Sequence, residues 1–265
     1  TDRIEAKCVV YGICGGCSFQ HLSSKYQIIA KQGWLQSAFM GQAKVLPKEW
    51  LDPLQVESWG YRRKARLGVR YVNKKDKVLV GFRERKSSFI AVMERCEVLH
   101  PLLGDNLELL GECIEKLSVK FHVPQIEVAI AELDTILILR HLQPLTSEDE
   151  AILQEYGEKL KVTWYTQSGG LETVKPLNEA VSLNYSLSDH DIKMTFLPTD
   201  FTQVNFELNQ KMINLALQLL DLNKEDEVID LFCGLGNFTL PISRYVKKVV
   251  GIEGDSGLVK RAKEN

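Results

Sequence analysis

The sequence lacks any hydrophobic run long enough to cross a membrane. No uninterrupted apolar stretch reaches about 18 residues, the length that a spanning helix needs. The first residues, TDRIEAKCVV, also lack the basic start and apolar run of a secretion signal. Internal repeats and low-complexity tracts are missing as well. We therefore expect a cytoplasmic globular protein with no membrane partner.

Cysteine is scarce, with six residues in 265, and half of the cysteines lie within ten residues. Cys8, Cys14 and Cys17 form a C-x5-C-x2-C pattern, and Cys96 is the next cysteine along the chain. In the cytoplasm such clustering favours a metal site over disulfides. The second C-x2-C pair of a usual structural zinc site is lacking. Three local thiolates and one distant one therefore favour a four-cysteine iron–sulfur cluster, with a zinc ion as the alternative.

The two remaining cysteines predict structural thiols. Cys113 lies in the middle of a helical pattern, ELLGECIEKL, and is expected to be a small buried side chain. Cys233 lies in a glycine-rich loop with no histidine nearby in sequence, which argues against a catalytic nucleophile.

Negative charge barely exceeds positive charge overall, but the positive charge is concentrated. Residues 61–86 hold eleven Lys/Arg and two Asp/Glu, so the rest of the chain carries a net charge of −11. Strand alternation in RRKARLGVRY places cations on one face and apolar side chains on the other. The polar NKKD predicts the turn of a hairpin formed by 61–72 and 77–86. The cationic face is expected to hold Arg62, Lys64, Arg66 and Arg70, opposite Ala65, Leu67, Val69 and Tyr71.

This one-sided cationic face predicts a polyanionic partner, although a solvated charged face is the simpler alternative. RNA fits better than duplex DNA, because no helix suited to reading a major groove is evident. The partner strand is expected to add further cations to the same surface. The predicted RNA contacts are Arg62, Arg63, Lys64, Arg66, Arg70, Arg83, Arg85 and Lys86.

Apolar periodicity predicts the remaining elements. Helices are expected at 23–40 (with Tyr26, Ile29, Ala30 and Trp34 on one face), 105–118, 148–160, 204–220, 237–246 and from 256. Further strands are expected at 125–131, 135–141, 161–166, 181–187, 192–197, 227–232 and 248–253. From about 201 the order β-α-β is typical of a parallel, doubly wound sheet. Two strands are too few for such a sheet, so we expect truncation or completion elsewhere.

A glycine-rich loop and a downstream acid predict a nucleoside cofactor. Asp230 ends one strand, and Gly234, Gly236 and Asn237 form the turn into the next helix, where the backbone can approach a ligand. Glu253 ends the following strand, at the place where an acid binds ribose hydroxyls. A dinucleotide fits this pattern, but D-x-x-x-G-x-G differs from G-x-G-x-x-G. An acid at the strand end favours the amine of S-adenosylmethionine over a pyrophosphate; a plain βα turn is the remaining alternative.

The cysteine cluster, the basic hairpin and the glycine-rich loop, in this order, resemble the RNA 5-methyluridine methyltransferases. The matching stretches span nearly the whole chain: GICGGCSFQH, GYRRKARL, VGFRERKS, ERCEVL, LPTDFTQVN, NQKM and DLFCGLGNFTLP. The resemblance is to the bacterial branch that methylates 23S ribosomal RNA and carries a [4Fe–4S] cluster, since relatives that methylate transfer RNA lack the cysteines. It implies an α/β plus α+β fold: the start of a Rossmann-like methyltransferase domain, and a β-rich central domain that carries the cluster.

The resemblance also implies roles for individual residues. Cys8, Cys14, Cys17 and Cys96 would ligate the cluster, and Phe201 would lie at the pocket for the target base. S-adenosylmethionine would be held by Gln203, Asp230, Phe232, Gly234, Gly236, Asn237 and Glu253. The central domain would take 1–19 and 52–200, the methyltransferase domain would begin at 201, and the helix 20–51 would pack against it. Such a protein is expected to act as a monomer on 23S ribosomal RNA.

The family's chemistry begins with a cysteine that attacks C6 of a flipped uracil. C5 then takes the methyl group, and a carboxylate removes the C5 proton. In the family this cysteine and the base glutamate lie beyond the position of residue 265, so we assign no catalytic residue and expect the fragment alone to be inactive. A non-catalytic RNA-binding module with an iron–sulfur cluster or zinc stays open as the alternative function.

Overall fold

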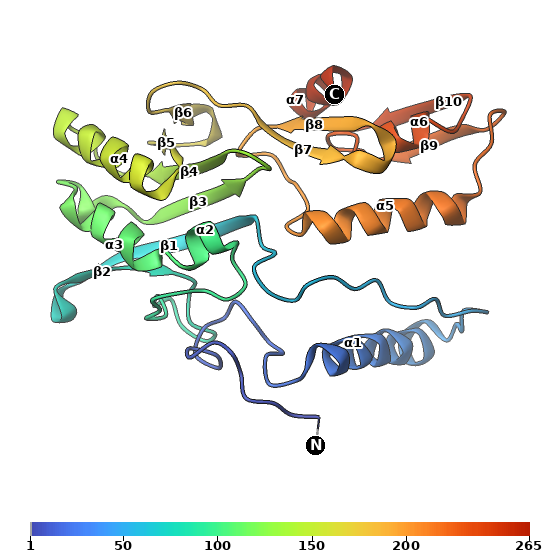
Figure 1. Cartoon of the computed structure of the whole chain (residues 1–265), viewed down its shortest axis with the longest axis horizontal. Coiled ribbons are helices and arrows are strands. Elements are labelled where there is room, and N and C mark those ends of the chain that lie inside the picture. Colours follow the sequence, from blue (N-terminus) through green and yellow to red (C-terminus); the bar gives the residue numbers. More distant parts are fainter. Residues whose placement is uncertain (1) are drawn as a thin grey trace.

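The computed structural model describes residues 2–265, which fold around a six-stranded mixed sheet (Figure 1). The α-helices are α1 Ser24–Ala38, α2 Pro101–Gly104, α3 Leu107–Lys116, α4 Ser147–Leu160, α5 Phe206–Leu220, α6 Thr239–Ser243 and α7 Ser256–Glu264. The strands are β1 Lys64–Val72, β2 Lys77–Gly81, β3 Gln125–Ile130, β4 Thr135–Arg140, β5 Thr163–Gln167, β6 Lys175–Pro176, β7 Leu183–Leu187, β8 Ile192–Phe196, β9 Glu227–Leu231 and β10 Lys248–Ile252. No helix in the described part of the chain is long and apolar enough to cross a membrane.

The central sheet has the strand order β2-β1-β3-β4-β5-β6. Each neighbouring pair among β2, β1, β3 and β4 is antiparallel, whereas β4 and β5 run parallel and are joined by α4. A parallel connection needs such a crossover, because the chain must return to the same edge before the second strand begins. Helix α4 is capped by Thr146, whose side chain accepts a hydrogen bond from the Asp149 N–H.

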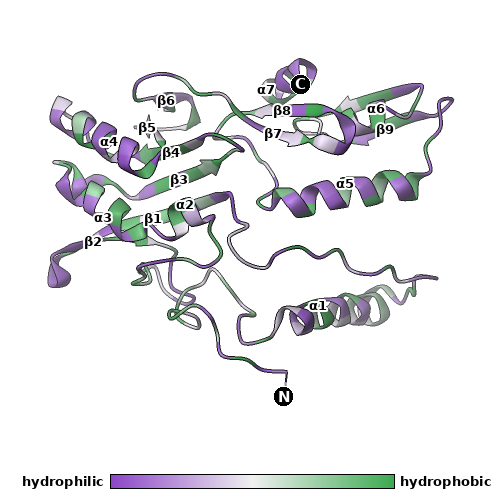
Figure 2. Ribbon diagram, in the orientation of Figure 1, coloured by the Kyte–Doolittle hydropathy of each residue, from purple (hydrophilic) through white to green (hydrophobic). Residues whose placement is uncertain are grey.

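Strand β4, with the apolar run 136–139, is buried on both faces, and β3 buries Ile126, Val128, Ala129 and Ile130 while its polar Gln125 and Glu127 stay partly exposed. Figure 2 shows the hydropathy of these strands. One face, with Ile126, Val128, Leu137 and Leu139, packs against α3 and α4. The opposite face, with residues such as Ile138, packs against the β7–β8 hairpin and reaches α5 and the glycine-rich loop. The sheet therefore joins the helical layer at one end of the molecule to the β-α-β unit at the other (Figure 1).

The predicted basic hairpin is confirmed: β1 and β2 pair antiparallel across the turn at 73–76. The alternation is also confirmed, because Leu67 and Val69 are buried in the core. The second strand ends at Gly81, earlier than expected, because the chain then folds back over the hairpin. A Cβ at Gly68 would lie 2.3 Å from Ile90, and one at Gly81 would lie 3.0 Å from Met93. These two glycines let residues 89–93 approach the strands closely.

The C-terminal part of the chain forms the predicted β-α-β unit. Strands β9 and β10 pair parallel, with α6 between them in sequence, and α7 follows β10. Helix α6 is shorter than the expected 237–246. Gly236, with φ +90°, still belongs to the turn, and the hydrogen bonds from Arg244 and Tyr245 reach back only three residues.

Helix α1 confirms the helix predicted over 23–40, but its expected apolar face does not enter the core. No residue of α1 is buried, and Ile29 and Trp34 are exposed. A five-residue π-helix, Phe39–Ala43, extends it. None of the four apolar positions enters a core, although their spacing is helical, and spacing alone could not reveal this.

Gly104 provides a test of how tightly residues 96–104 are packed. It is buried at the end of α2, and a Cβ there would lie 2.5 Å from the Cys96 carbonyl oxygen, a backbone atom that cannot rotate away. We expect Gly104→Ala to lower the free energy of unfolding by about 1–3 kcal/mol. Urea unfolding followed by circular dichroism measures this change.

Gly33→Ala is the matched control, because a Cβ at Gly33 in α1 meets nothing within 4 Å. Replacing a helical glycine in open space should leave stability unchanged or raise it by about 0.5–1 kcal/mol. Equal stability of the two variants would contradict the packing described at Gly104.

Candidate functional site

The four cysteines predicted to act together line one small cavity. Cys8, Cys14 and Cys17 come from the N-terminal loop, and Cys96 comes from the segment after the hairpin. The two segments are joined through the backbone, because the Gly15 N–H donates to the Arg83 carbonyl at 2.9 Å and the Arg85 N–H donates to the Ile13 carbonyl at 2.8 Å. The other walls of the cavity include Phe82, Met93 and Val98.

The environment of these thiols is largely apolar. Burial raises the pKa of Cys14 and of Cys96, and the neighbouring thiols Cys8 and Cys17 raise both values further. Four sulfur donors around one cavity match the ligand set of an iron–sulfur cluster or of zinc. Within residues 2–265, however, no group of three or more cysteine, histidine or acidic side chains stands close enough to hold a metal ion. The structure thus places the four sulfur donors around one cavity, but not close enough together to coordinate a metal ion.

The cations at the start of the hairpin point into the protein. The Arg63 guanidinium donates to the Ala131 carbonyl at 2.9 Å and lies over the Phe206 ring. The Lys64 amine donates to the backbone carbonyl of Asp200, and burial lowers the pKa of Lys64. Arg62 likewise uses its Nε to bond the Lys64 carbonyl, at 3.2 Å. These three cations are held by protein atoms before any partner binds.

Farther along β1, Arg66 and Arg70 reach solvent. The Arg66 side chain is 68% exposed although it pairs with Glu127 at 3.1 Å, and Arg70 lies over the exposed ring of Phe89. Cations beside exposed aromatic rings suit single-stranded nucleic acid, because bases can stack on the rings while the cations meet phosphates. This part of the cationic face is available to a partner.

The expectation that the second strand adds three more cations is wrong in detail. Arg83, Arg85 and Lys86 follow the end of β2 and lie in the loop that folds toward the cysteines. The Arg85 guanidinium donates to the Cys17 carbonyl at 2.7 Å, so this side chain braces the cysteine loop.

The glycine-rich loop lies where β9 ends and brings the two predicted acids to one edge. The Glu253 carboxylate accepts hydrogen bonds from the N–H groups of Gly234 and Asp255, both at 3.0 Å, and these bonds lower the pKa of Glu253. Asp230 accepts from the Thr239 hydroxyl at 2.5 Å. Two oriented carboxylates at the ends of adjacent parallel strands can accept hydrogen bonds from a ligand's hydroxyl or amine groups.

Backbone conformation sets the shape of this loop. Phe232, Gly234 and Gly236 all have positive φ, and for Phe232 this left-handed conformation is strained. The Phe232 side chain is 89% exposed beside the turn. Backbone strain in a loop with an exposed aromatic ring is typical of a ligand site.

Asn237 is held by partners that the sequence analysis missed. Its side-chain amide pairs with that of Asn209 on α5 through two hydrogen bonds of 2.9 Å, and its oxygen also accepts from the Tyr185 hydroxyl. Burial raises the pKa of Tyr185, which keeps the hydroxyl protonated as a donor. No sequence signal connects these three positions, because their pairing arises where α5 and the β7–β8 hairpin meet the loop.

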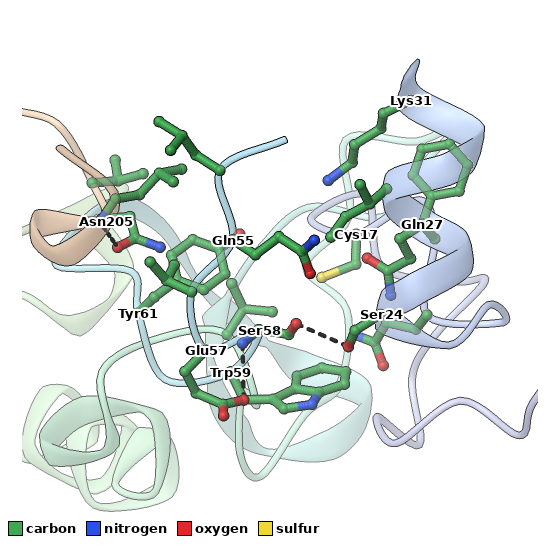
Figure 3. Close-up of a pocket in the computed structure, with 18 of the residues that line it drawn as sticks. Cys17, Ser24, Gln27, Lys31, Gln55, Glu57, Ser58, Trp59, Tyr61 and Asn205 are labelled. Carbon is green, nitrogen blue, oxygen red and sulfur yellow. Dashed lines mark hydrogen bonds between the residues drawn. The ribbon is translucent and has the colours of Figure 1, made fainter. Parts of the chain in front are cut away.

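Gln203 lies in a different place from the two acids. It lines a groove of about 480 Å³ between α1, residues 54–61 and the start of α5 (Figure 3). Gln55 and Lys31 point into this groove, and the Ser24 and Ser58 hydroxyls are bonded across it at 2.9 Å. The groove also reaches Cys17, so it connects the cysteine loop with the segment that carries Gln203. Phe201, two residues earlier, is 76% exposed.

Fold and loop together define the class: a mixed α/β protein with a central sheet and a β-α-β unit of the kind that binds nucleotide-like cofactors. The model of the tRNA (Uracil-5-)-methyltransferase family matches residues 61–265. The chain belongs to this family.

Individual relatives agree with this assignment. The chain is 64% identical to the 23S rRNA (uracil(1939)-C(5))-methyltransferase RlmD of Vesicomyosocius okutanii, over 100% of this chain and 60% of the relative. It is 51% identical to the RlmD protein of Nitrosococcus oceani, over 100% of this chain and 59% of that protein. The chain therefore spans about three fifths of the length of the curated relatives it matches.

A solved structure shares the fold. The Pyrococcus abyssi tRNA (uracil-54, C5)-methyltransferase, in complex with S-adenosyl-L-homocysteine, superposes with a TM-score of 0.68. The match covers 96% of this chain and 62% of that chain, at 17% identity. At that identity the likeness concerns the fold.

Proposed function

We propose that the whole protein transfers a methyl group from S-adenosylmethionine to C5 of a uridine in 23S ribosomal RNA. The observation that carries this proposal is the 64% identity, over the whole chain, to a protein named for that reaction. The S-adenosyl-L-homocysteine bound to the protein of the same fold supports the methyl donor. A ribosomal RNA substrate also implies a cytoplasmic protein, and we infer that it acts as a monomer.

The residues proposed to hold S-adenosylmethionine surround the glycine-rich loop. Glu253 is kept ionised by two backbone donors and would accept from the ribose hydroxyls, while Asp230 would accept from the amine. The exposed Phe232 ring would cover an apolar part of the ligand. The full proposed set is Gln203, Asp230, Phe232, Gly234, Gly236, Asn237 and Glu253.

We further infer a [4Fe–4S] cluster held by Cys8, Cys14, Cys17 and Cys96. The shared cavity and its apolar walls support this ligand set. When bound, the cluster would cross-link the N-terminal loop to the segment after the hairpin. Because Arg85 already braces the Cys17 carbonyl, we infer a structural role for the cluster: it would position the basic surface.

The resemblance to the family also implies where the domain boundaries of the chain lie. We propose that 1–19 and 52–200 form the central domain, and that 20–51 packs with the methyltransferase domain that begins at 201. The groove supports this arrangement, since α1 faces α5 across it. The apolar side chains Ile229, Leu231, Val250 and Ile252 are exposed on β9 and β10, as expected of a sheet that further strands or helices would cover.

The reaction is tested with full-length protein and ribosomal RNA that contains 5-fluorouracil. We propose that a cysteine outside these 265 residues bonds to C6 of the base during methyl transfer. With unsubstituted RNA, loss of the C5 proton after methyl transfer releases the methylated base from the cysteine. Fluorine at C5 cannot be removed in this way, so the covalent adduct should persist in denaturing gels. A protein that neither forms the adduct nor methylates unsubstituted RNA would refute the proposed reaction.

The cluster is tested by anaerobic purification of the full-length protein. We expect a brown protein with about four irons and four sulfides per chain. Cys96→Ala should lose the iron, whereas Cys113→Ala should keep it, because Cys113 is buried in the helical core away from the cavity. Colourless protein with one zinc per chain would show that the same cysteines hold zinc instead.

RNA binding is tested at the two exposed cations. We expect the double variant Arg66→Ala/Arg70→Ala to weaken binding of a 23S ribosomal RNA fragment, because two phosphate contacts are lost. The slope of log K against log salt should fall in magnitude by about 1.4. Filter binding over a range of salt concentrations measures this slope.

Lys116→Ala/Lys159→Ala is the matched control, since these exposed lysines lie on the helical side of the sheet, over the Tyr156 ring. This control variant removes two positive charges, as the test variant does, and should leave the slope of log K against log salt unchanged. Equal effects of the two double variants would show that net charge, and not the hairpin surface, determines binding.

A further inference from the structure

Asp200 occupies the junction between the central sheet and the β-α-β unit. It follows β8 and directly precedes the segment 201–203, which carries both Phe201 and Gln203. Its side chain is among the few charged ones that are buried, with a residue exposure of 7%. A buried carboxylate needs partners, because burial of an unpaired charge is costly.

The carboxylate of Asp200 is paired on both oxygens. Oδ1 accepts from the Arg261 guanidinium at 2.5 Å, and Oδ2 accepts from the Leu197 N–H at 2.7 Å. Arg261 lies on α7, the helix that follows β10, and Glu253 lies in the loop between β10 and α7. The ion pair therefore links the start of the 201–203 segment to the element just after the proposed ribose-binding acid.

The backbone around the segment is tied at one end to Lys64, the first residue of β1, and at the other end to Arg63, the residue before it. The Asp200 carbonyl accepts from the Lys64 amine, and the Val204 carbonyl accepts from the Arg63 N–H at 3.0 Å. The strand that carries the exposed cations Arg66 and Arg70 is thus anchored to the residues on either side of Phe201 and Gln203.

The side chains inside the segment contribute little to its placement. Thr202 is 4% exposed, yet its hydroxyl has no hydrogen-bond partner among residues 2–265. Phe201 extends into solvent, and Gln203 faces the groove. The position of the segment therefore depends on Asp200 at one end and Val204 at the other, and of the two only Asp200 contributes a charged side chain.

We propose that Asp200 is a positioning residue, which holds Phe201 and Gln203 in place between the RNA-facing strand and the cofactor loop. This inference rests on the proposed function, since it assumes that these two residues meet the target base and S-adenosylmethionine. Asp200 acts through them and touches neither ligand. Loss of its charge leaves Arg261 unpaired and removes the side-chain link between this end of the segment and α7, whereas the main-chain bond to Lys64 remains there.

The test uses full-length protein with Asp200→Asn, which keeps the size and the acceptor for the Leu197 N–H but removes the charge that holds Arg261. We expect the dissociation constant for S-adenosylmethionine, measured by calorimetry, to rise about tenfold, and the single-turnover methylation rate to fall about 100-fold. Iron content and RNA affinity should stay within about twofold of wild type, because the exposed cations and the cysteines are untouched. Hydrogen exchange of amides 200–205 should become faster.

Asp149→Asn is the matched control. Asp149 is a buried carboxylate as well, and it accepts from the Ser118 N–H, the Ser118 hydroxyl and the Thr146 N–H, but it lies in α4 in the helical layer. The Asp149→Asn substitution should lower the melting temperature without changing the affinity for S-adenosylmethionine, the methylation rate or the hydrogen exchange of amides 200–205. Arg261→Lys should retain more of the cofactor affinity than Arg261→Gln, because only the lysine preserves a cation for Asp200.

Two results would overturn the inference. If Asp200→Asn lowered the melting temperature as Asp149→Asn does, but left cofactor affinity and rate unchanged, Asp200 would be only a stabilising residue. Unchanged exchange at 200–205 would show that it does not hold the segment. Failure of the proposed function has a separate signature, because wild-type protein would then bind no S-adenosylmethionine, and a role of Asp200 toward that cofactor would fall with it.

Discussion

Burial of the central sheet on both faces is the constraint on which the rest of the structure depends. Because β4 and the end of β3 have buried apolar side chains on both faces, each face needs its own cover. One cover is the helical layer of α3 and α4, and the other is the β7–β8 hairpin, with α5 and the glycine-rich loop behind it. The sheet thereby connects the cationic hairpin at its β1–β2 edge to the proposed cofactor site.

The same hairpin serves two physical roles along its length. Near the start of the hairpin, the Arg63 and Lys64 side chains donate hydrogen bonds to main-chain carbonyls of neighbouring segments of the protein. Farther along, Arg66 and Arg70 reach solvent. A charged side chain that contacts a backbone carbonyl at a junction stabilises that junction, whereas an exposed one can neutralise a phosphate. A shared strand thus joins the RNA-facing surface to the segment that carries Phe201 and Gln203.

Much of the fold could be predicted because the chain follows local rules consistently. The two-residue period of β1 identified its buried face, and the glycines after β9 identified the turn. Where prediction failed, the cause was a contact distant in sequence. Strand β2 ends early because residues 89–93 pack over Gly68 and Gly81, and α1 keeps an amphipathic spacing without a core to face.

For the candidate site, the sequence by itself determined which residue types could act: four cysteines, a face of cations, and two acids spaced for a βα nucleotide site. Only the tertiary structure decided how they are grouped. It brought Cys96 to the N-terminal cysteines, divided the cations into buried and exposed ones, and paired Asn237 with Asn209. It also connected Asp200 to Arg261 and Lys64, which are 61 and 136 residues away along the chain. Spacing and periodicity report on neighbours within one element, whereas these groupings depend on how separate elements pack.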